Sequence, residues 1–286
     1  MSILSDRDII RELGRGIFFH PLKPSPKSKH LKGSIRASDL CFTASENAYS
    51  MGLQQTLPIQ TESNPDQPNE EQKFFYIPPR DTTLVWTDES VWLSNQFRGP
   101  LYSVVEQASE GLGHIGTRVN PCWAAVLCIP LHNVSDKPLR IDVRNVNKPI
   151  AYLAIEKLSS RSSIDQNSDN PGRMDLIDGK PNSQAISDFY NKTENLWMKD
   201  KDKLKARMEK SDEYQELKKG VKDKLLGFLG SDQQTRWTAL GVIISLIALL
   251  IALFKPSDSS NLNPRTDINS QTQANPNKTV SPGSNK

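Results

Sequence analysis

Few residues of this 286-residue chain have the spacing of catalytic or metal-binding groups. A GxGxxG pattern occurs at Gly111, Gly113 and Gly116, but it leads into TRVNP rather than a helix. We therefore interpret it as a flexible loop and not as a dinucleotide site. His114 and His132 have no partner at metal or triad spacing, and there is no P-loop, HExxH or GxSxG motif. The residue pattern alone predicts no catalytic residue, no metal and no cofactor.

Charge and cysteine content restrict the expected partners. The net charge of +3 is too mild to indicate a nucleic-acid partner, and many basic residues cluster near an apolar segment close to the C-terminus. That clustering suits anionic lipid better, so we expect a membrane partner and no nucleic acid. Cys41, Cys122 and Cys128 form no CxxC pair. We expect them to be reduced thiols in a cytoplasmic domain.

The elements that would position any site are mainly strands. From Lys73 to Leu158, short segments rich in β-branched and aromatic residues alternate with Pro, Asn, Asp and Gly, a pattern typical of an all-β barrel or sandwich. The segments are KFFYI, TTLVWT, SVWLS, LYSVV, WAAVLCIPL, LRIDV and IAYLAI. Before them, Ser5 and Asp8 predict a capped helix near the N-terminus. Residues 57–72 predict a solvated loop.

Polar sequence follows the strands. Residues 159–190 predict a polar linker, and residues 191–230 predict a charged amphipathic helix. The apolar stripe of that helix consists of Tyr214, Leu217, Val221, Leu225 and Phe228. The helix could lie on a membrane surface, pack against copies of itself or remain solvated. Residues 255–286 have the composition of a disordered tail.

The segment from Trp237 to Phe254, WTALGVIISLIALLIALF, contains no charged residue. As a helix it would be about 27 Å long, close to the thickness of a bilayer's hydrocarbon core. We predict a single transmembrane helix over 237–254. Basic residues are in excess on its N-terminal side, which places residues 1–235 in the cytoplasm.

The opening MSILSDRDIIRELGRGIFFHPL resembles the start of dCTP deaminases, members of the dUTPase-like superfamily. Arg118-Val119-Asn120-Pro121-Cys122-Trp123 resembles the family's arginine-Ile-Asp-Pro-Gly-Trp turn, and residues 150–155 resemble its final strand. The resemblance covers residues 1–158. It implies a distorted β-barrel that assembles as a homotrimer, with nucleotide sites between subunits.

The catalytic positions implied by the resemblance are changed in this chain. The glutamate that activates water in the family corresponds to Pro130, which has no acid–base group. The phosphate-binding Ser-Ser-x-x-Arg run corresponds to residues 103–107, so its second serine is Val104 and its arginine is Gln107. The aspartate of the turn is Asn120. The family's early Ser-x-Asp-Leu-Arg motif and its C-terminal lid have no clear counterparts. These differences predict a barrel without deaminase or dUTPase activity.

Several polar and aromatic residues could still contact a ligand in such a pocket, although residues of this kind also hold turns. The possible ligand-binding residues are Ser103, Gln107, Arg118, Asn120 and Trp123. Our main hypothesis is a membrane-anchored, catalytically inactive relative of dCTP deaminase that binds a nucleotide or a protein and signals to the membrane, as in nucleotide sensing or phage defence. One alternative is an active, membrane-tethered dCTP deaminase or dUTP diphosphatase. Another is a structural anchor that only oligomerises.

Overall fold

The computed structural model describes residues 2–24, 33–64, 67–114, 116–164 and 172–228, together with Ser245. The chain divides into two units, Met1–Leu225 and Leu226–Lys286. The described strands and helices belong to the first unit, apart from the last residues of one helix. The predicted transmembrane helix and the predicted tail therefore lie outside the described residues, apart from Ser245. Within the described residues, no helix is both long enough and apolar enough to cross a membrane.

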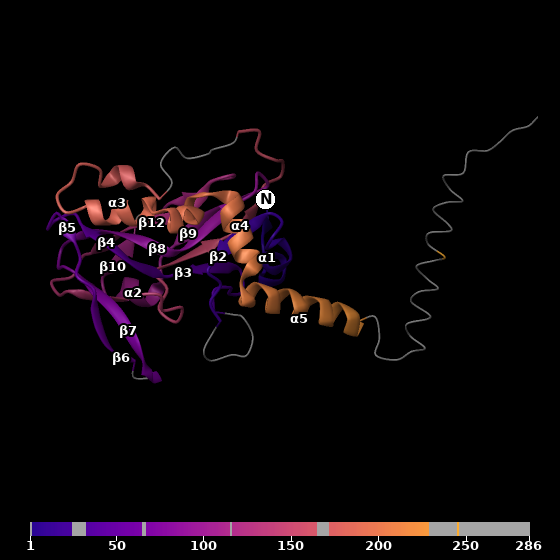
Figure 1. The fold of residues 1–286 in the computed structure, drawn as a ribbon, viewed down its shortest axis with the longest axis horizontal. Coiled ribbons are helices and arrows are strands. Elements are labelled where there is room, and N and C mark those ends of the chain that lie inside the picture. Colours follow the sequence, from indigo (N-terminus) through magenta and orange to yellow (C-terminus); the bar gives the residue numbers. More distant parts are fainter. Residues whose placement is uncertain are drawn as a thin grey trace, which may run out of the picture. The chain divides into compact units, whose positions relative to one another are not determined.

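Antiparallel strands in three sheets make up the body of the first unit (Figure 1), which confirms the prediction of a mainly β chain. The first sheet contains β1 (Ser2–Ile3), β15 (Glu156–Lys157), β9 (Phe97–Tyr102), β14 (Ala151–Ala154) and β3 (Asp39–Phe42), with β11 (Arg118–Val119) paired to β9. The second contains β10 (Leu112–His114), β12 (Ala124–Asn133), β8 (Thr82–Leu93), β4 (Ala44–Ser50) and β5 (Gln55–Thr56), with β2 (Ile17–His20) paired to β8. The third contains β13 (Leu139–Asp142), β7 (Gln67–Ile77) and β6 (Gln60–Asn64).

Strand β8 is buried on both of its faces. Val85 belongs to the main apolar core, whereas its neighbours Leu84 and Trp86 belong to a second apolar cluster. Alternate residues of a strand point to opposite faces, so both faces of β8 are covered. The sequence segments TTLVWT and SVWLS are therefore one long strand rather than two. The polar pair Asp88 and Glu89 lies within it instead of forming a turn.

The N-terminal helix α1 (Asp6–Glu12) forms as predicted. The Ser5 hydroxyl accepts a hydrogen bond from the Asp8 backbone N–H, and the Asp8 carboxylate accepts one from the Ser5 backbone N–H. This capping box satisfies backbone donors that the first turn leaves unpaired. Ile9 is fully buried and anchors the helix to the core.

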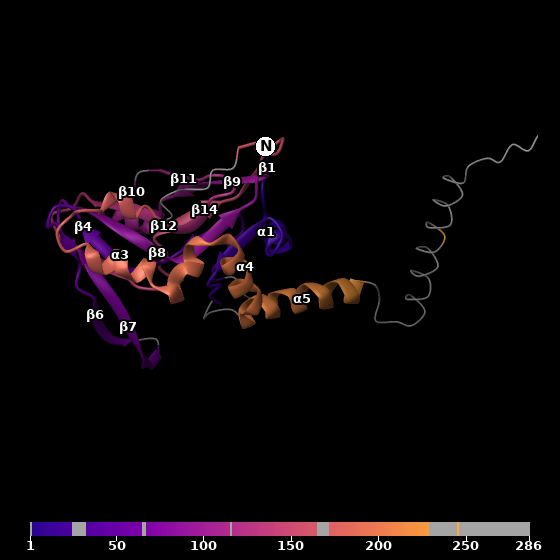
Figure 2. The same ribbon diagram turned by 45° about the horizontal axis from the view of Figure 1, so that its top comes forward.

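The chain after the strands is not a linker in its described part, which corrects one prediction. Residues 172–218, which we call the helical strap, pack against the second sheet (Figure 2). Its elements are η1 (Met174–Leu176), α3 (Gln184–Asn191), η2 (Thr193–Lys199), α4 (Lys201–Lys210) and the start of α5 (Asp212–Phe228). Ile177, Ile186 and Tyr190 are buried in the second apolar cluster. The polar composition of 159–190 concealed these three anchors.

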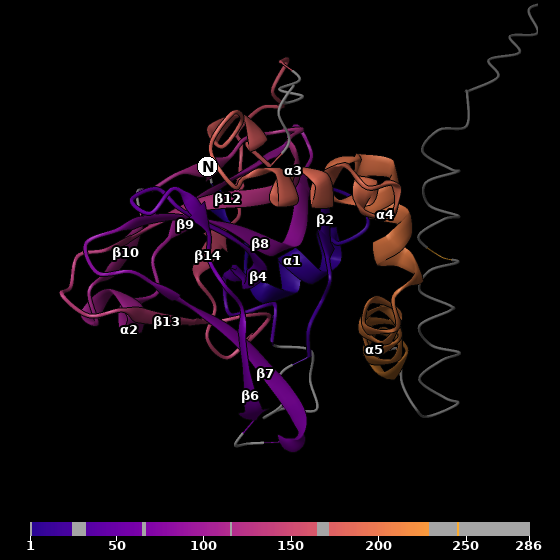
Figure 3. The ribbon, with the colours of Figure 1, turned by 60° about the vertical axis from the view of Figure 1, so that its left-hand side comes forward.

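The predicted single helix over 191–230 is broken into η2, α4 and α5. Asp200 caps α4 by accepting from the backbone N–H groups of Asp202 and Lys203, and Ser211 separates α4 from α5. Helix α4 packs on β2 (Figure 3) through the buried side chains of Leu204 and Met208. Of the predicted apolar stripe, Tyr214 and Leu217 are buried in the main apolar core, whereas the side chains of Val221, Leu225 and Phe228 lie outside the described part of the structure.

Side-chain to backbone hydrogen bonds fix the helical strap at several points. Trp86 Nε1 donates to the Gly172 carbonyl (2.5 Å), Tyr49 Oη to the Pro181 carbonyl (2.9 Å), Ser90 Oγ to the Met198 carbonyl (2.6 Å) and Lys218 Nζ to the Ile10 carbonyl (3.1 Å). Each bond joins one residue of the strap to a strand or to α1. The strap is thus part of the same folded unit as the strands.

Two shorter predictions also need correction. Residues 57–72, expected to be a solvated loop, contain β6 and the beginning of β7, which form a hairpin projecting from the other strands (Figure 1). Arg140 of β13 supports the base of this hairpin by pairing with Glu62 and packing over the Phe74 ring at 3.9 Å. The segment LYSVV is only partly strand, because β9 ends at Tyr102 and helix α2 (Val105–Ser109) follows.

Candidate functional site

An open hollow of about 600 Å³ lies over strands β9, β11 and β15. Its lining residues are Arg98, Pro100, Leu101, Tyr102, Gly116, Thr117, Arg118 and Glu156. A volume of this size falls within the range of small-ligand sites. The hollow is formed by residues that are far apart in sequence and are brought together by strand pairing.

Strand register explains why the polar residues meet on one face. Arg98, Pro100 and Tyr102 alternate along β9, so their side chains point to the same side of the sheet. Arg118 of β11 lies opposite Pro100, and Glu156 of β15 lies opposite Arg98. Side chains of directly opposed residues in antiparallel strands share a face. The hollow therefore has two guanidinium groups, one carboxylate and one tyrosine ring.

The two arginines of the hollow differ in their partners. Arg98 Nε donates to Glu156 Oε2 at 2.7 Å, and the Glu156 side chain is only 13% exposed. Among the described residues, no carboxylate pairs with Arg118, and its side chain is exposed. Tyr102 is 53% exposed although it is a large aromatic residue. The hollow thus presents one cation without a carboxylate partner among the described residues, Arg118, and one solvent-accessible aromatic ring, Tyr102.

Of the five residues predicted as possible ligand contacts, Arg118 lines the hollow. Ser103 directly follows β9, whereas Gln107 lies on α2. Asn120 and Trp123 lie in the turn after β11, where the Trp123 backbone N–H donates to the Asn120 carbonyl at 3.4 Å. The structure does not gather these five side chains around one pocket.

Sequence reasoning missed Arg98, Tyr102, Thr117 and Glu156. The alternation in FRGPLY, with Phe97, Gly99 and Leu101 facing one way, could have indicated an outward face bearing Arg98 and Tyr102. Thr117 and Glu156 reach the hollow only through pairing of distant strands. No local signal in the sequence marks them.

The turn between β11 and β12 keeps an unusual backbone conformation. Cys122 has φ of 64°, in the left-handed region that favours glycine. Its backbone N–H donates to the Leu93 carbonyl at 2.7 Å, which ties the turn to the end of β8. Cys122 therefore occupies a backbone conformation in which glycine would be less strained.

The position that would carry a water-activating glutamate is part of a strand. Pro130 lies in β12 opposite Leu84 of β8, between the buried residues Ile129 and Leu131. Proline offers no group that could accept or donate a proton. Glu156 is the one carboxylate among the described residues that line the hollow, and it is held by Arg98. Besides Glu156, the Tyr102 phenol is the other group with a titratable proton among the described residues that line the hollow, apart from the arginines.

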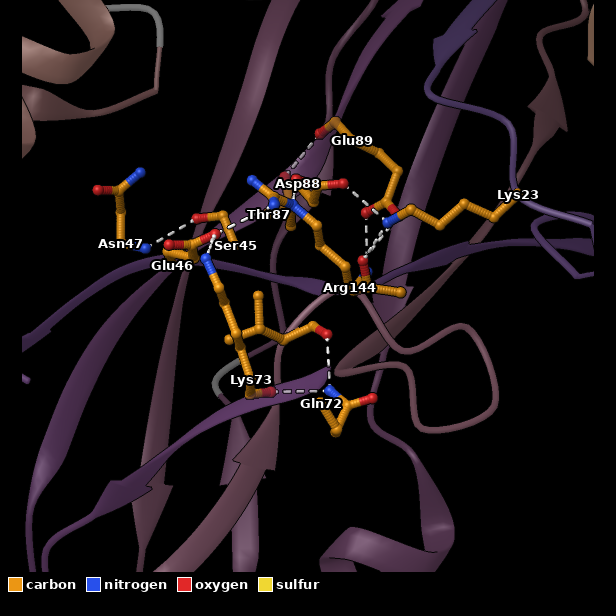
Figure 4. A network of polar contacts seen from close by, with 12 residues as sticks. Lys23, Ser45, Glu46, Asn47, Gln72, Lys73, Thr87, Asp88, Glu89 and Arg144 are labelled. Atoms are coloured by element: carbon orange, nitrogen blue, oxygen red, sulfur yellow. Dashed lines mark hydrogen bonds and ion pairs between the residues drawn. The ribbon is translucent and has the colours of Figure 1, made fainter. Parts of the chain in front are cut away.

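A second group of charges lies around β8 and is largely buried (Figure 4). Lys23 Nζ contacts Glu89 Oε1 at 2.6 Å, Asp88 Oδ2 at 2.8 Å and Thr43 Oγ1 at 2.7 Å. Glu89 is fully buried and also accepts from the Thr43 backbone N–H at 2.8 Å. Arg144 Nε donates to Asp88 Oδ1 at 2.8 Å. We call Lys23, Thr43, Asp88, Glu89 and Arg144 the buried ion network.

The protonation behaviour of the buried ion network follows from burial and pairing. Burial raises the pKa of the Glu89 carboxyl, and Lys23 only partly opposes this effect. Burial also disfavours ionised Asp88, but Lys23 and Arg144 outweigh it and lower the pKa of that carboxyl. Burial disfavours charged Lys23, yet Glu89 and Asp88 raise its pKa overall. Among the described residues, none of the buried side-chain nitrogen and oxygen atoms of the network lacks a hydrogen-bond partner, so it has the features of a structural element rather than a ligand site.

No group of three or more His, Cys, Asp or Glu side chains is arranged for a metal ion in the described part of the chain. His132 Nδ1 is within hydrogen-bond distance of Thr82 Oγ1, at 2.8 Å. Burial raises the pKa of the Cys128 thiol to about 12 and that of Cys41 to about 11, so neither is a thiolate at neutral pH.

No protein-family model matches this chain, and comparison with curated proteins gives no match. Solved structures do match in part. The 2'-deoxycytidine 5'-triphosphate deaminase from Agrobacterium tumefaciens matches with a TM-score of 0.39 and 10% identity, over 55% of this chain and 48% of the deaminase. The EIAV dUTPase matches with a TM-score of 0.27 and 18% identity, over 39% of this chain and 98% of that enzyme. The dUTPase from phage phi11 of S. aureus matches with a TM-score of 0.32 and 11% identity, over 51% and 92%.

The chain thus spans about half the length of the deaminase structure that it matches. The structural neighbours are deaminase and dUTPase folds at low identity and partial coverage. These similarities do not assign an activity to the chain.

Proposed function

We propose that this protein is a membrane-anchored, non-catalytic member of the dCTP deaminase and dUTPase-like superfamily. Its β domain binds a nucleotide in the hollow over β9, β11 and β15 and transmits binding to the apolar segment 237–254. The observation that carries the proposal is Arg118, whose exposed guanidinium lines a ligand-sized hollow and has no carboxylate partner in the part of the chain that the structure describes. Arginine is well suited to phosphate because its donors form a planar fork.

Two observations support the non-catalytic part of the proposal, one from the sequence resemblance, at Pro130 outside the hollow, and one from the carboxylate that lines the hollow. Deamination or phosphate hydrolysis requires a base that can activate water within hydrogen-bond reach. Pro130 replaces the glutamate that the sequence resemblance implies, and Glu156 is engaged by Arg98 at 2.7 Å. Binding without turnover is therefore the function that these groups can support.

Contacts between the hollow and the helical strap support transmission. The turn after Arg118 is tied to Leu93 of β8 by the Cys122 backbone N–H. Next to Leu93, the Trp92 ring stacks on Phe18 with a centroid distance of 4.5 Å, and Lys201 of α4 lies 4.7 Å from the Trp92 ring. A contiguous series of packed groups is a physical route for coupling, and its energetic contribution is measurable.

The proposed assembly is a homo-oligomer, a trimer by family resemblance, with the β domain in the cytoplasm. One apolar helix per chain cannot line a pore by itself. Any permeabilising action would therefore require several copies. A nucleotide-sensing or phage-defence role fits this arrangement of a binding domain with a membrane segment.

Membrane anchoring is tested by alkaline carbonate extraction of membranes from cells that express the full chain. We expect the chain to remain in the membrane pellet, since eighteen uncharged residues stabilise insertion. The variant Leu249→Arg should move it toward the supernatant, whereas Asn261→Arg, beyond the apolar segment, should not. Recovery of the unaltered chain in the supernatant would contradict anchoring.

Nucleotide binding is tested with the full chain in detergent by titration with deoxynucleotides and cyclic nucleotides, with products assayed in the same samples. We expect binding without release of ammonia or pyrophosphate. Turnover of dCTP or dUTP would instead identify a membrane-tethered enzyme. Neither binding nor turnover would favour a structural anchor that only oligomerises.

A further inference from the structure

The hollow has fewer positive charges than a triphosphate has negative charges. Three of its eight lining residues have charged side chains at neutral pH, namely Arg98, Arg118 and Glu156. Glu156 compensates one of the two guanidinium groups, so the hollow has the net charge of one cation. A site that binds several phosphates usually presents several uncompensated donors or a metal ion.

The pair formed by Arg98 and Glu156 is held in place by its surroundings. The residues lie directly opposite each other on β9 and β15, and the bond from Arg98 Nε to Glu156 Oε2 is 2.7 Å long. The Glu156 side chain is 13% exposed and that of Arg98 is 37% exposed. The pair is neutral overall, so while it persists it adds no net attraction for additional phosphate groups.

We infer that the hollow selects a nucleotide with a single phosphate group, as a monophosphate or a phosphodiester, over the triphosphate of the same base. This inference rests on the proposed function and specifies its ligand class. Arg118 pairs with the phosphate, whose charge at neutral pH is between about −1 and −2. The exposed Tyr102 ring, two residues along β9 from Pro100, provides a face on which a base can stack. Because Glu156 holds Arg98, the Arg98 guanidinium is not free to bind a second or third phosphate.

The test uses the full chain in detergent and calorimetric titration with dCMP, dCTP and deoxycytidine, and with the corresponding uracil and adenine compounds. Each series is run with EDTA and again with Mg²⁺. We expect the monophosphate to bind more tightly than the triphosphate of the same base, and the uncharged nucleoside to bind at least tenfold more weakly than the monophosphate. Triphosphate binding as tight as or tighter than monophosphate binding would overturn this inference and leave the proposed function intact. No binding by any of these compounds would overturn both.

Three variants separate the roles of the charges. Arg118→Gln should weaken monophosphate binding at least tenfold and leave nucleoside binding unchanged. Arg80→Gln, which removes an exposed guanidinium paired with Asp136, is the matched control and should change neither. Glu156→Gln keeps the size of the side chain and should increase triphosphate binding relative to monophosphate binding at least tenfold. An unchanged ratio in Glu156→Gln, with native thermal unfolding, would show that the carboxylate does not select the ligand.

Discussion

The buried ion network and the hollow both combine arginine or lysine with carboxylates, but they differ in how completely the charges are paired. In the network, Lys23 contacts Asp88 and Glu89 within 2.8 Å, and Glu89 has no exposure to solvent. In the hollow, Arg98 is paired with Glu156, whereas Arg118 has no carboxylate partner among the described residues. A satisfied, buried group of charges fixes a structure, and an unsatisfied, exposed one is available to a ligand.

Removing one charge from the network should have the largest effect on stability. Lys23→Met leaves Glu89 buried without its cation, and loss of one partner of a buried pair costs about 3–5 kcal/mol. We expect the free energy of unfolding of the full chain, measured by urea titration, to fall by that amount. Adding Glu89→Gln to Lys23→Met should recover part of the loss, because the orphan charge is removed. A loss below about 1 kcal/mol for Lys23→Met would contradict a structural role for the network.

Acid should also weaken the same region, through protonation of His20. Burial lowers the pKa of His20 from 6.5 to about 4, with Arg207 and Lys23 acting in the same direction and Asp88 opposing them. Because the folded-state pKa is below the unfolded value, the stabilisation is complete above pH 6.5 and is lost as the pH falls toward 4. The loss is on the order of 2 kcal/mol, allowing for partial exposure of the ring.

The measurement is urea unfolding of the full chain from pH 7.5 to 4. His20→Gln should remove most of the decline between pH 6.5 and 4, whereas Arg118→Gln, as a control distant from β2 in sequence, should retain it. An identical decline in His20→Gln would contradict the assignment to His20.

Breaking the ion pair between Arg98 and Glu156 should have a smaller effect on the free energy of unfolding. Arg98→Gln leaves Glu156 without its cation, but Glu156 can still reach solvent, so we expect a loss of about 1 kcal/mol. Urea unfolding at pH 7 measures this change. A loss as large as that of Lys23→Met would show that the hollow, like the network, is primarily structural.

Removing the unpaired charge of the hollow should have the smallest effect on stability. Arg118→Gln should change the free energy of unfolding by less than about 0.5 kcal/mol, because the side chain is exposed and makes no ion pair with the described residues. The same urea titration tests this. A larger loss would mean that Arg118 holds the turn after β11 and is not reserved for a ligand.

Sequence reasoning succeeded where local patterns are strong. The capped N-terminal helix follows from Ser5 and Asp8, and the strands after Lys73 follow from their β-branched and aromatic residues. It failed for the helical strap, where isolated anchors such as Ile177 and Tyr190 lie within polar sequence. Their burial depends on a sheet face formed by distant strands.

The site was predictable to a lesser extent than the fold. Arg118 could be selected because its turn resembles a known motif, but its neighbours in the hollow come from β9 and β15. Lys23 and Glu89 were also missed, because a lysine between two prolines and an acid within a strand give no local indication of pairing. Long-range pairing creates both groups of charges.

The central claim is that the β domain binds a nucleotide without converting it. The most direct measurement is to incubate the full chain with radiolabelled dCMP, dCTP and dUTP, and to record retained label and reaction products in the same samples. The account predicts retained dCMP that is lost in Arg118→Gln, and no deaminated or hydrolysed product from any nucleotide. Formation of dUTP from dCTP, or of dUMP from dUTP, at a rate that scales with protein concentration would contradict it.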